Sequence, residues 1–111
     1  MAVLERLKPE RVFYYFEEIC KIPHGSGNTK QISDYLAAFA QKQGLKYIQD
    51  ESNNVVIYKD ASPGYENAPV VILQGHMDMV CEKLPSSKHD FERDPLDLQV
   101  EGDFISAKGT T

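Results

Sequence analysis

The stretch Val70-Val71-Ile72-Leu73-Gln74-Gly75-His76-Met77-Asp78-Met79-Val80 decides the fold that we expect for this chain. A run of branched apolar residues ends at Gly75, and His76 and Asp78 follow, one residue apart. Such a run predicts a strand over residues 70–75 that is buried on both faces of a sheet. In open α/β sheets, binding sites form beyond the carboxyl ends of the strands. The sequence therefore places a metal-ligating side chain and a carboxylate where chemistry is favoured.

Two amphipathic helices are expected before this strand. Apolar residues at helical spacing predict one helix over residues 9–20, which ends ahead of Pro23. A second apolar stripe predicts a helix over residues 29–43 with Asn28 as its N-cap. Both helices are expected to serve packing rather than catalysis.

Two hairpins complete the pattern. Residues 45–49 and the β-branched residues 55–58 flank a turn-forming segment, and residues 96–108 alternate around Gly102. Residues 81–95 form a long polar connection, which is typical of the border of a site. The order of elements predicts an α/β fold with a mixed sheet and helices. Because two helices cannot cover both faces of such a sheet, the pattern also indicates a fragment of a larger domain.

Length and composition exclude several classes of protein. The chain has 111 residues, which suits one small domain, and its net charge of -5 argues against a nucleic-acid partner. No apolar run approaches the length of a membrane span, and the early charges at the N-terminus do not suit a signal peptide. Cys20 and Cys81 form no CxxC motif and fit a reducing cytoplasm, with Cys81 expected to be a buried structural thiol.

His76 and Asp78 form the candidate site. In an extended segment, residues i and i+2 point to the same face, so these two side chains are expected to project together. A neutral imidazole is a good zinc ligand, and a neighbouring carboxylate commonly holds its other N–H. The alternative is a histidine at a strand end that hydrogen-bonds locally and binds no metal.

One histidine does not hold a catalytic zinc ion, which needs three protein ligands and a water. His24 and His89 are the other histidines, and their polar surroundings predict solvent exposure for both. The loop of residues 25–28 resembles a phosphate cradle before a helix but lacks the GxxxxGK[ST] pattern. It is therefore expected only to lead into the second helix.

The chain resembles the N-terminal part of the aminoacyl-histidine dipeptidases, which are di-zinc metallopeptidases of the aminoacylase/carboxypeptidase-like kind. The resemblance covers nearly the whole chain, and the block around His76 is its most specific part. The residues that carry it are 19–24, 35–36, Asn54, 64–67, 70–80, 89–91, 94–95 and 107–111.

The resemblance implies that His76 is a zinc ligand and that Asp78 orients this ligand and counts as catalytic. It implies two zinc ions per complete site, sharing a water that a glutamate deprotonates, although cobalt or manganese would also suit such ligands. The implied substrates are small peptides, above all dipeptides ending in histidine, and the full-length protein is compatible with a homodimer in the cytoplasm.

The resemblance also implies that residues 1–111 are the N-terminal portion of the catalytic domain. In the family, the Gly-Thr-Thr segment leads directly into the motif with the metal-bridging aspartate, and this chain ends at Thr111. The chain by itself is therefore expected to be inactive and to bind zinc weakly. Two alternatives remain open: a non-catalytic α/β module that binds a partner, and a related exopeptidase or deacylase of the same clan.

Overall fold

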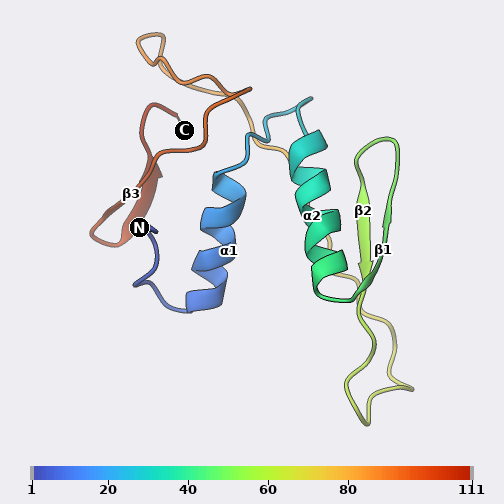
Figure 1. The fold of residues 1–111 in the computed structure, drawn as a ribbon. Coiled ribbons are helices and arrows are strands. Elements are labelled where there is room, and N and C mark those ends of the chain that lie inside the picture. Colours follow the sequence, from blue (N-terminus) through green and yellow to red (C-terminus); the bar gives the residue numbers. More distant parts are fainter. Residues whose placement is uncertain (1, 111) are drawn as a thin grey trace. The chain divides into compact units, whose positions relative to one another are not determined.

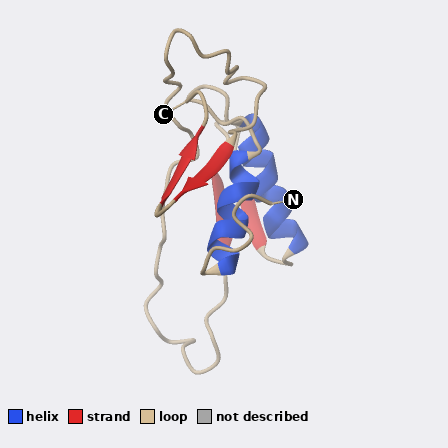
Figure 2. Cartoon of the chain, turned by 90° about the vertical axis from the view of Figure 1, so that its left-hand side faces the viewer, coloured by secondary structure: helices blue, strands red, loops and turns tan. Residues whose placement is uncertain are grey.

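The computed structural model describes residues 2–110, and its helices and strands are shown in Figure 1. In chain order the elements are α1 (Glu10–Cys20), α2 (Lys30–Lys42), β1 (Lys46–Gln49), β2 (Val55–Tyr58), β3 (Leu98–Glu101) and β4 (Phe104–Ala107). Loops make up much of the remaining chain (Figure 2). The chain divides into two compact units: unit 1 joins the segment up to Ile32 to the segment from Asp78 onward, and unit 2 is Ser33–Met77.

Both predicted helices are confirmed, with one change at a cap. Pro9 takes the N-cap position of α1 in an extended conformation, φ -72° and ψ 132°. The N-terminal cap predicted for the second helix is wrong by one position, because α2 begins at Lys30 and Thr29 therefore precedes it. Asn28 instead closes a turn, its backbone N–H donating to the Gly25 carbonyl at 2.8 Å.

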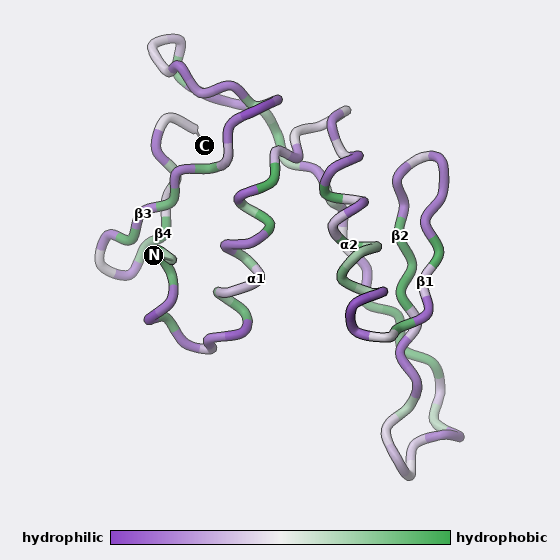
Figure 3. The backbone as a smooth tube through the Cα atoms, in the orientation of Figure 1, coloured by the Kyte–Doolittle hydropathy of each residue, from purple (hydrophilic) through white to green (hydrophobic). Residues whose placement is uncertain are grey.

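Unit 2 combines most of α2 with the first predicted hairpin. Strands β1 and β2 pair antiparallel, and Asp50 accepts hydrogen bonds from the backbone N–H groups of Ser52 and Asn54 in the turn between them. The Gln49 amide donates to Ser33 Oγ at 2.8 Å, which ties the hairpin to α2. Strand β2 is strongly hydrophobic (Figure 3).

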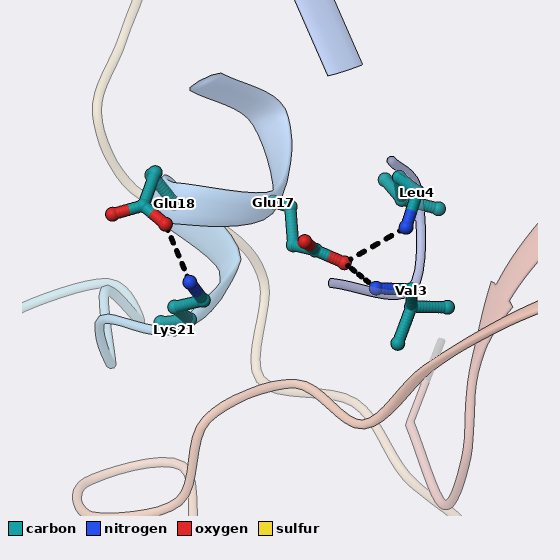
Figure 4. Close-up of polar contacts among 5 residues, drawn as sticks. All are labelled: Val3, Leu4, Glu17, Glu18 and Lys21. Carbon is teal, nitrogen blue, oxygen red and sulfur yellow. Dashed lines mark hydrogen bonds and ion pairs between the residues drawn. The ribbon is translucent and has the colours of Figure 1, made fainter. Parts of the chain in front are cut away.

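Unit 1 holds α1, the second predicted hairpin and the N-terminal segment. Strands β3 and β4 pair antiparallel around Gly102, which has a φ of 61°. Glu17 on α1 is buried, and its Oε1 accepts hydrogen bonds from the backbone N–H groups of Val3 (2.6 Å) and Leu4 (3.0 Å), as Figure 4 shows. These bonds replace the hydration that the buried carboxylate loses, and they hold the fully buried Leu4 against α1.

The predicted strand over residues 70–75 is wrong for the part of the chain that the structure describes. These residues are not assigned to a strand, and Val70, Val71, Ile72 and Leu73 are 90%, 80%, 83% and 94% exposed. A strand needs a neighbouring backbone to satisfy its N–H and C=O groups, and residues 2–110 supply none here.

The α/β class is confirmed, but the strands are arranged differently from the mixed sheet that we expected. Residues 2–110 form two separate two-stranded antiparallel sheets. Parallel pairing occurs in an isolated bridge between Gly25 and Met79. None of the helices described has the combination of length and apolar character that crossing a membrane would require.

Candidate functional site

The two predicted site residues lie on either side of the division between the units. His76 is exposed and belongs to unit 2, which ends at Met77. Asp78 is half-buried and begins the second segment of unit 1. The expectation that both side chains project from one face stays a prediction.

In unit 1, the backbone next to Asp78 is attached to the loop between the helices. The Ser26 N–H donates to the Met79 carbonyl at 3.0 Å, and the Met79 N–H donates to the His24 carbonyl at 3.0 Å. These two bonds form the parallel bridge between Gly25 and Met79. The loop of residues 25–28, expected only to lead into a helix, therefore also holds the backbone of the candidate site.

The Asp78 side chain is held by the same loop. Ser26 Oγ lies 2.7 Å from Asp78 Oδ2 and 3.3 Å from the Met79 carbonyl oxygen. An ionised carboxylate only accepts hydrogen bonds, so the serine hydroxyl is the donor. The shorter distance and the negative charge favour Asp78 as the acceptor, and the Met79 carbonyl already receives the Ser26 N–H.

Gly25 allows this close approach. It is buried, and a Cβ atom at this position would lie 2.4 Å from the Cys81 sulfur. No side chain fits there unless Cys81 moves. Cys81 itself is exposed, so the prediction that it is a buried structural thiol is wrong; among the described residues both cysteines are free.

His24 and His89 are both partly buried, so the predicted solvent exposure is wrong for both. His24 Nδ1 lies 2.6 Å from the Ile22 carbonyl oxygen, which places the proton on Nδ1, because a carbonyl only accepts. The His89 ring packs edge-on against Phe91, with ring centroids 4.7 Å apart. Both histidines line a small cavity of about 10 Å³ beside Met79, which is about the space of one water molecule.

The described residues do not form a complete metal site. Within residues 2–110, no three His, Cys, Asp or Glu side chains lie together as a cation site would require. A hollow of about 570 Å³ in unit 1 is lined by Val3, Glu17, Lys21 and residues 95–98, and it contains neither His76 nor Asp78. The side chains of His76 and Asp78 are of the types that suit a zinc ligand and the group that orients it.

Reasoning from the sequence missed Ser26 as a partner of Asp78. The two residues are 52 positions apart, and a lone serine in a glycine-rich loop has no distinguishing pattern. The nearest signal is the glycine-rich loop of residues 25–28, which the sequence predicts only to precede the second helix. Gly25 in fact permits backbone contact with residues 79–81.

Known proteins match this chain over all or nearly all of its length. No protein-family model matches the sequence. The chain is 37% identical over 111 residues to the cytosol non-specific dipeptidase of Escherichia coli (strain K12), of which it spans 23%. It also matches the crystal structure of aminoacylhistidine dipeptidase from Vibrio alginolyticus, with a TM-score of 0.92 and 39% identity over 97% of this chain and 22% of that chain.

The chain thus spans less than a quarter of the length of either relative. The relatives are dipeptidases by name, and the identity is well above the level at which only a fold is shared. The resemblance to aminoacyl-histidine dipeptidases that the sequence indicated is therefore confirmed: in sequence and in fold, this chain is similar to one segment of these enzymes.

Proposed function

We propose that residues 1–111 are the N-terminal portion of the catalytic domain of a zinc-dependent dipeptidase that acts in the cytoplasm on dipeptides ending in histidine. The observation that carries this proposal is the match of the chain to two dipeptidases, over all 111 residues for one and over 97% of the chain for the other. One relative is named for aminoacylhistidine substrates and the other for the cytosol, and both names support the finer parts of the proposal.

In this proposal His76 ligates zinc through one ring nitrogen. Its exposure suits a ligand that must be reached by a cation. Asp78 accepts a hydrogen bond from the other ring N–H, which fixes the tautomer and raises the basicity of the ligating nitrogen. When bound, the zinc ions would polarise the scissile carbonyl and lower the pKa of a water molecule.

Within residues 2–110, no group of three metal-ligating side chains lies together. A complete site therefore needs groups from elsewhere in a dipeptidase. Cobalt or manganese would satisfy the same imidazole and carboxylate chemistry, so the choice of zinc rests on the relatives. A homodimer of the full-length protein remains part of the proposal.

The test uses the complete product of the encoding gene. Zinc content and hydrolysis of a Xaa-His dipeptide are measured for the wild type, for His76→Ala and for Gln74→Ala, an exposed neighbour on the same segment. We expect His76→Ala to lose tight zinc binding and to lower kcat/KM by at least about a thousandfold, because a catalytic metal loses a ligand. Gln74→Ala should match the wild type.

Three results would contradict the proposal. Full activity of His76→Ala would show that His76 is not a ligand of a catalytic metal. A wild type that binds a partner without hydrolysing any dipeptide would favour a binding module. Faster hydrolysis of N-acyl amino acids than of Xaa-His dipeptides would point instead to a deacylase of the same clan.

A further inference from the structure

The hydrogen bond between Ser26 and Asp78 joins the candidate catalytic carboxylate to a loop more than fifty residues earlier in the sequence. The loop contributes both a side-chain contact to Asp78 and two backbone contacts to the adjacent Met79. We propose that Ser26 is a positioning residue, whose hydroxyl holds the Asp78 carboxylate in the orientation required to support His76. This inference rests on the proposed function.

The first argument is geometric. The bond is 2.7 Å long and engages Asp78 Oδ2, which restricts rotation of the carboxylate about its terminal torsion. That torsion is otherwise broad and costs little to change. A carboxylate that orients an imidazole acts through direction, so fixing one oxygen fixes where the other lies.

The second argument is that the donor is itself fixed. The Ser26 N–H and the Met79 N–H both make 3.0 Å backbone bonds across the same pair of segments, and a Cβ on the neighbouring Gly25 would lie 2.4 Å from the Cys81 sulfur. Ser26 therefore has little backbone freedom left to lose when its hydroxyl binds Asp78. A serine on a loop without such backbone hydrogen bonds would not have this advantage.

The third argument concerns competing acceptors. Ser26 Oγ lies 3.3 Å from the Met79 carbonyl oxygen, so the hydroxyl has one neutral and one charged acceptor within reach. The carboxylate is closer and carries charge, and it receives the stronger bond. The same serine thus acts on the carboxylate through its hydroxyl and on the backbone through its N–H.

The experiment compares Ser26→Ala and Ser26→Thr in the complete gene product, with Ser106→Ala as the control. The Ser106 hydroxyl oxygen also takes part in a hydrogen bond, accepting from the Gln99 amide at 3.0 Å within the β3–β4 hairpin. Ser26→Ala should lower kcat about fivefold, as expected for loss of one hydrogen bond to a charged group, with KM within twofold of the wild type. Ser26→Thr keeps the hydroxyl and should restore kcat, and Ser106→Ala should match the wild type.

A second readout does not depend on activity. The absorption spectrum of the cobalt-loaded protein reports the geometry of the ligating imidazole. Ser26→Ala should shift this spectrum in the same direction as Asp78→Ala, but by a smaller amount. Ser26→Cys keeps the side-chain volume with a weaker donor, and it should give an intermediate spectrum. This variant keeps the test decisive where Ser26→Ala is poorly folded.

A double-mutant cycle separates positioning from a merely structural role. In the Asp78→Ala background, Ser26→Ala should leave the zinc dissociation constant unchanged, because the carboxylate on which it acts is gone. If Ser26→Ala changes the zinc dissociation constant equally in both backgrounds, the proposed role of Ser26 is wrong. The same holds if Ser26→Ala has the kcat and spectrum of the wild type while Asp78→Ala is defective. In both cases the proposed role of Asp78 would stand. Wild-type behaviour of Asp78→Ala would instead overturn the proposed function of Asp78, and the inference about Ser26 with it.

Discussion

The segment around Leu4 and the segment of residues 70–73 are both apolar, yet their surroundings are opposite. Leu4 is 1% exposed, and its backbone is held by Glu17, whereas Leu73 is 94% exposed. The apolar character of a side chain is the same in both places. Burial is decided by whether a second segment is available to cover it, and for residues 70–73 no such segment lies within residues 2–110.

The largest expected effect comes from truncating the two leucines. Leu4→Ala should lower the free energy of unfolding by about 3 kcal/mol, because it removes buried methyl groups and leaves a cavity. Leu73→Ala should change it by less than about 0.5 kcal/mol, since its side chain is already in water. Urea denaturation of both variants measures the difference, and equal losses would show that residues 70–73 are covered after all.

The two cysteines should differ in reactivity. Cys20 is buried, and burial, with a smaller contribution from Glu17, raises the pKa of its thiol to about 11, whereas Cys81 is exposed. At pH 8 roughly one Cys20 thiol in a thousand is ionised, so we expect alkylation at Cys20 to be at least about a hundredfold slower than at Cys81. Mass spectrometry of Cys20→Ser and Cys81→Ser assigns each rate, and similar rates would contradict the burial of α1 at this point.

The same raised pKa predicts a pH dependence of stability. The unfolded thiol loses its proton near 9.0 and the folded one near 11, so the folded state binds more protons between these values. The free energy of unfolding should therefore fall as pH rises from about 9 to about 11. Cys20→Ala should remove this part of the decline, which a urea series over that range would detect.

Adjacent glutamates on α1 offer a smaller contrast. Glu17→Gln removes the charge that accepts the N–H groups of Val3 and Leu4, and it should cost about 1–2 kcal/mol. Glu18→Gln disrupts only a surface ion pair with Lys21, whose nitrogen lies 2.5 Å from the carboxylate, and it should cost less than about 0.5 kcal/mol. Thermal unfolding at neutral pH compares the stability of the two variants. A larger loss of stability for Glu18→Gln would contradict the greater importance of the buried Glu17 carboxylate.

The smallest effect is expected in the turn between β1 and β2. Hydrogen bonds from the side chain and backbone of Asn54 hold the pKa of Asp50 below its ordinary value of 3.8. The bonds of this carboxylate therefore contribute stability above that pH, and the contribution is lost as the pH falls below it. Asp50→Ala should flatten the acid side of the stability profile below about pH 4.

Helices and hairpins were predictable because their signals are local. The apolar stripe of α1 and the turn residues of both hairpins lie within a few positions of the bonds that they form. The same reasoning failed at residues 70–75 because a continuous apolar run says that a segment can be buried, and not what buries it. It also placed Asn28 one residue too early at the start of α2.

In the candidate site, too, local features were predictable and contacts between distant segments were not. The sequence by itself singles out His76 and Asp78 as candidates, since an imidazole and a carboxylate lie within three adjacent residues. Only the tertiary structure decided that Ser26 hydrogen-bonds to Asp78 and that a Cβ at Gly25 would meet the Cys81 sulfur. These hydrogen bonds join segments some fifty residues apart in the sequence. They form only when the fold brings the two segments together, and the spacing of nearby residues does not predict this.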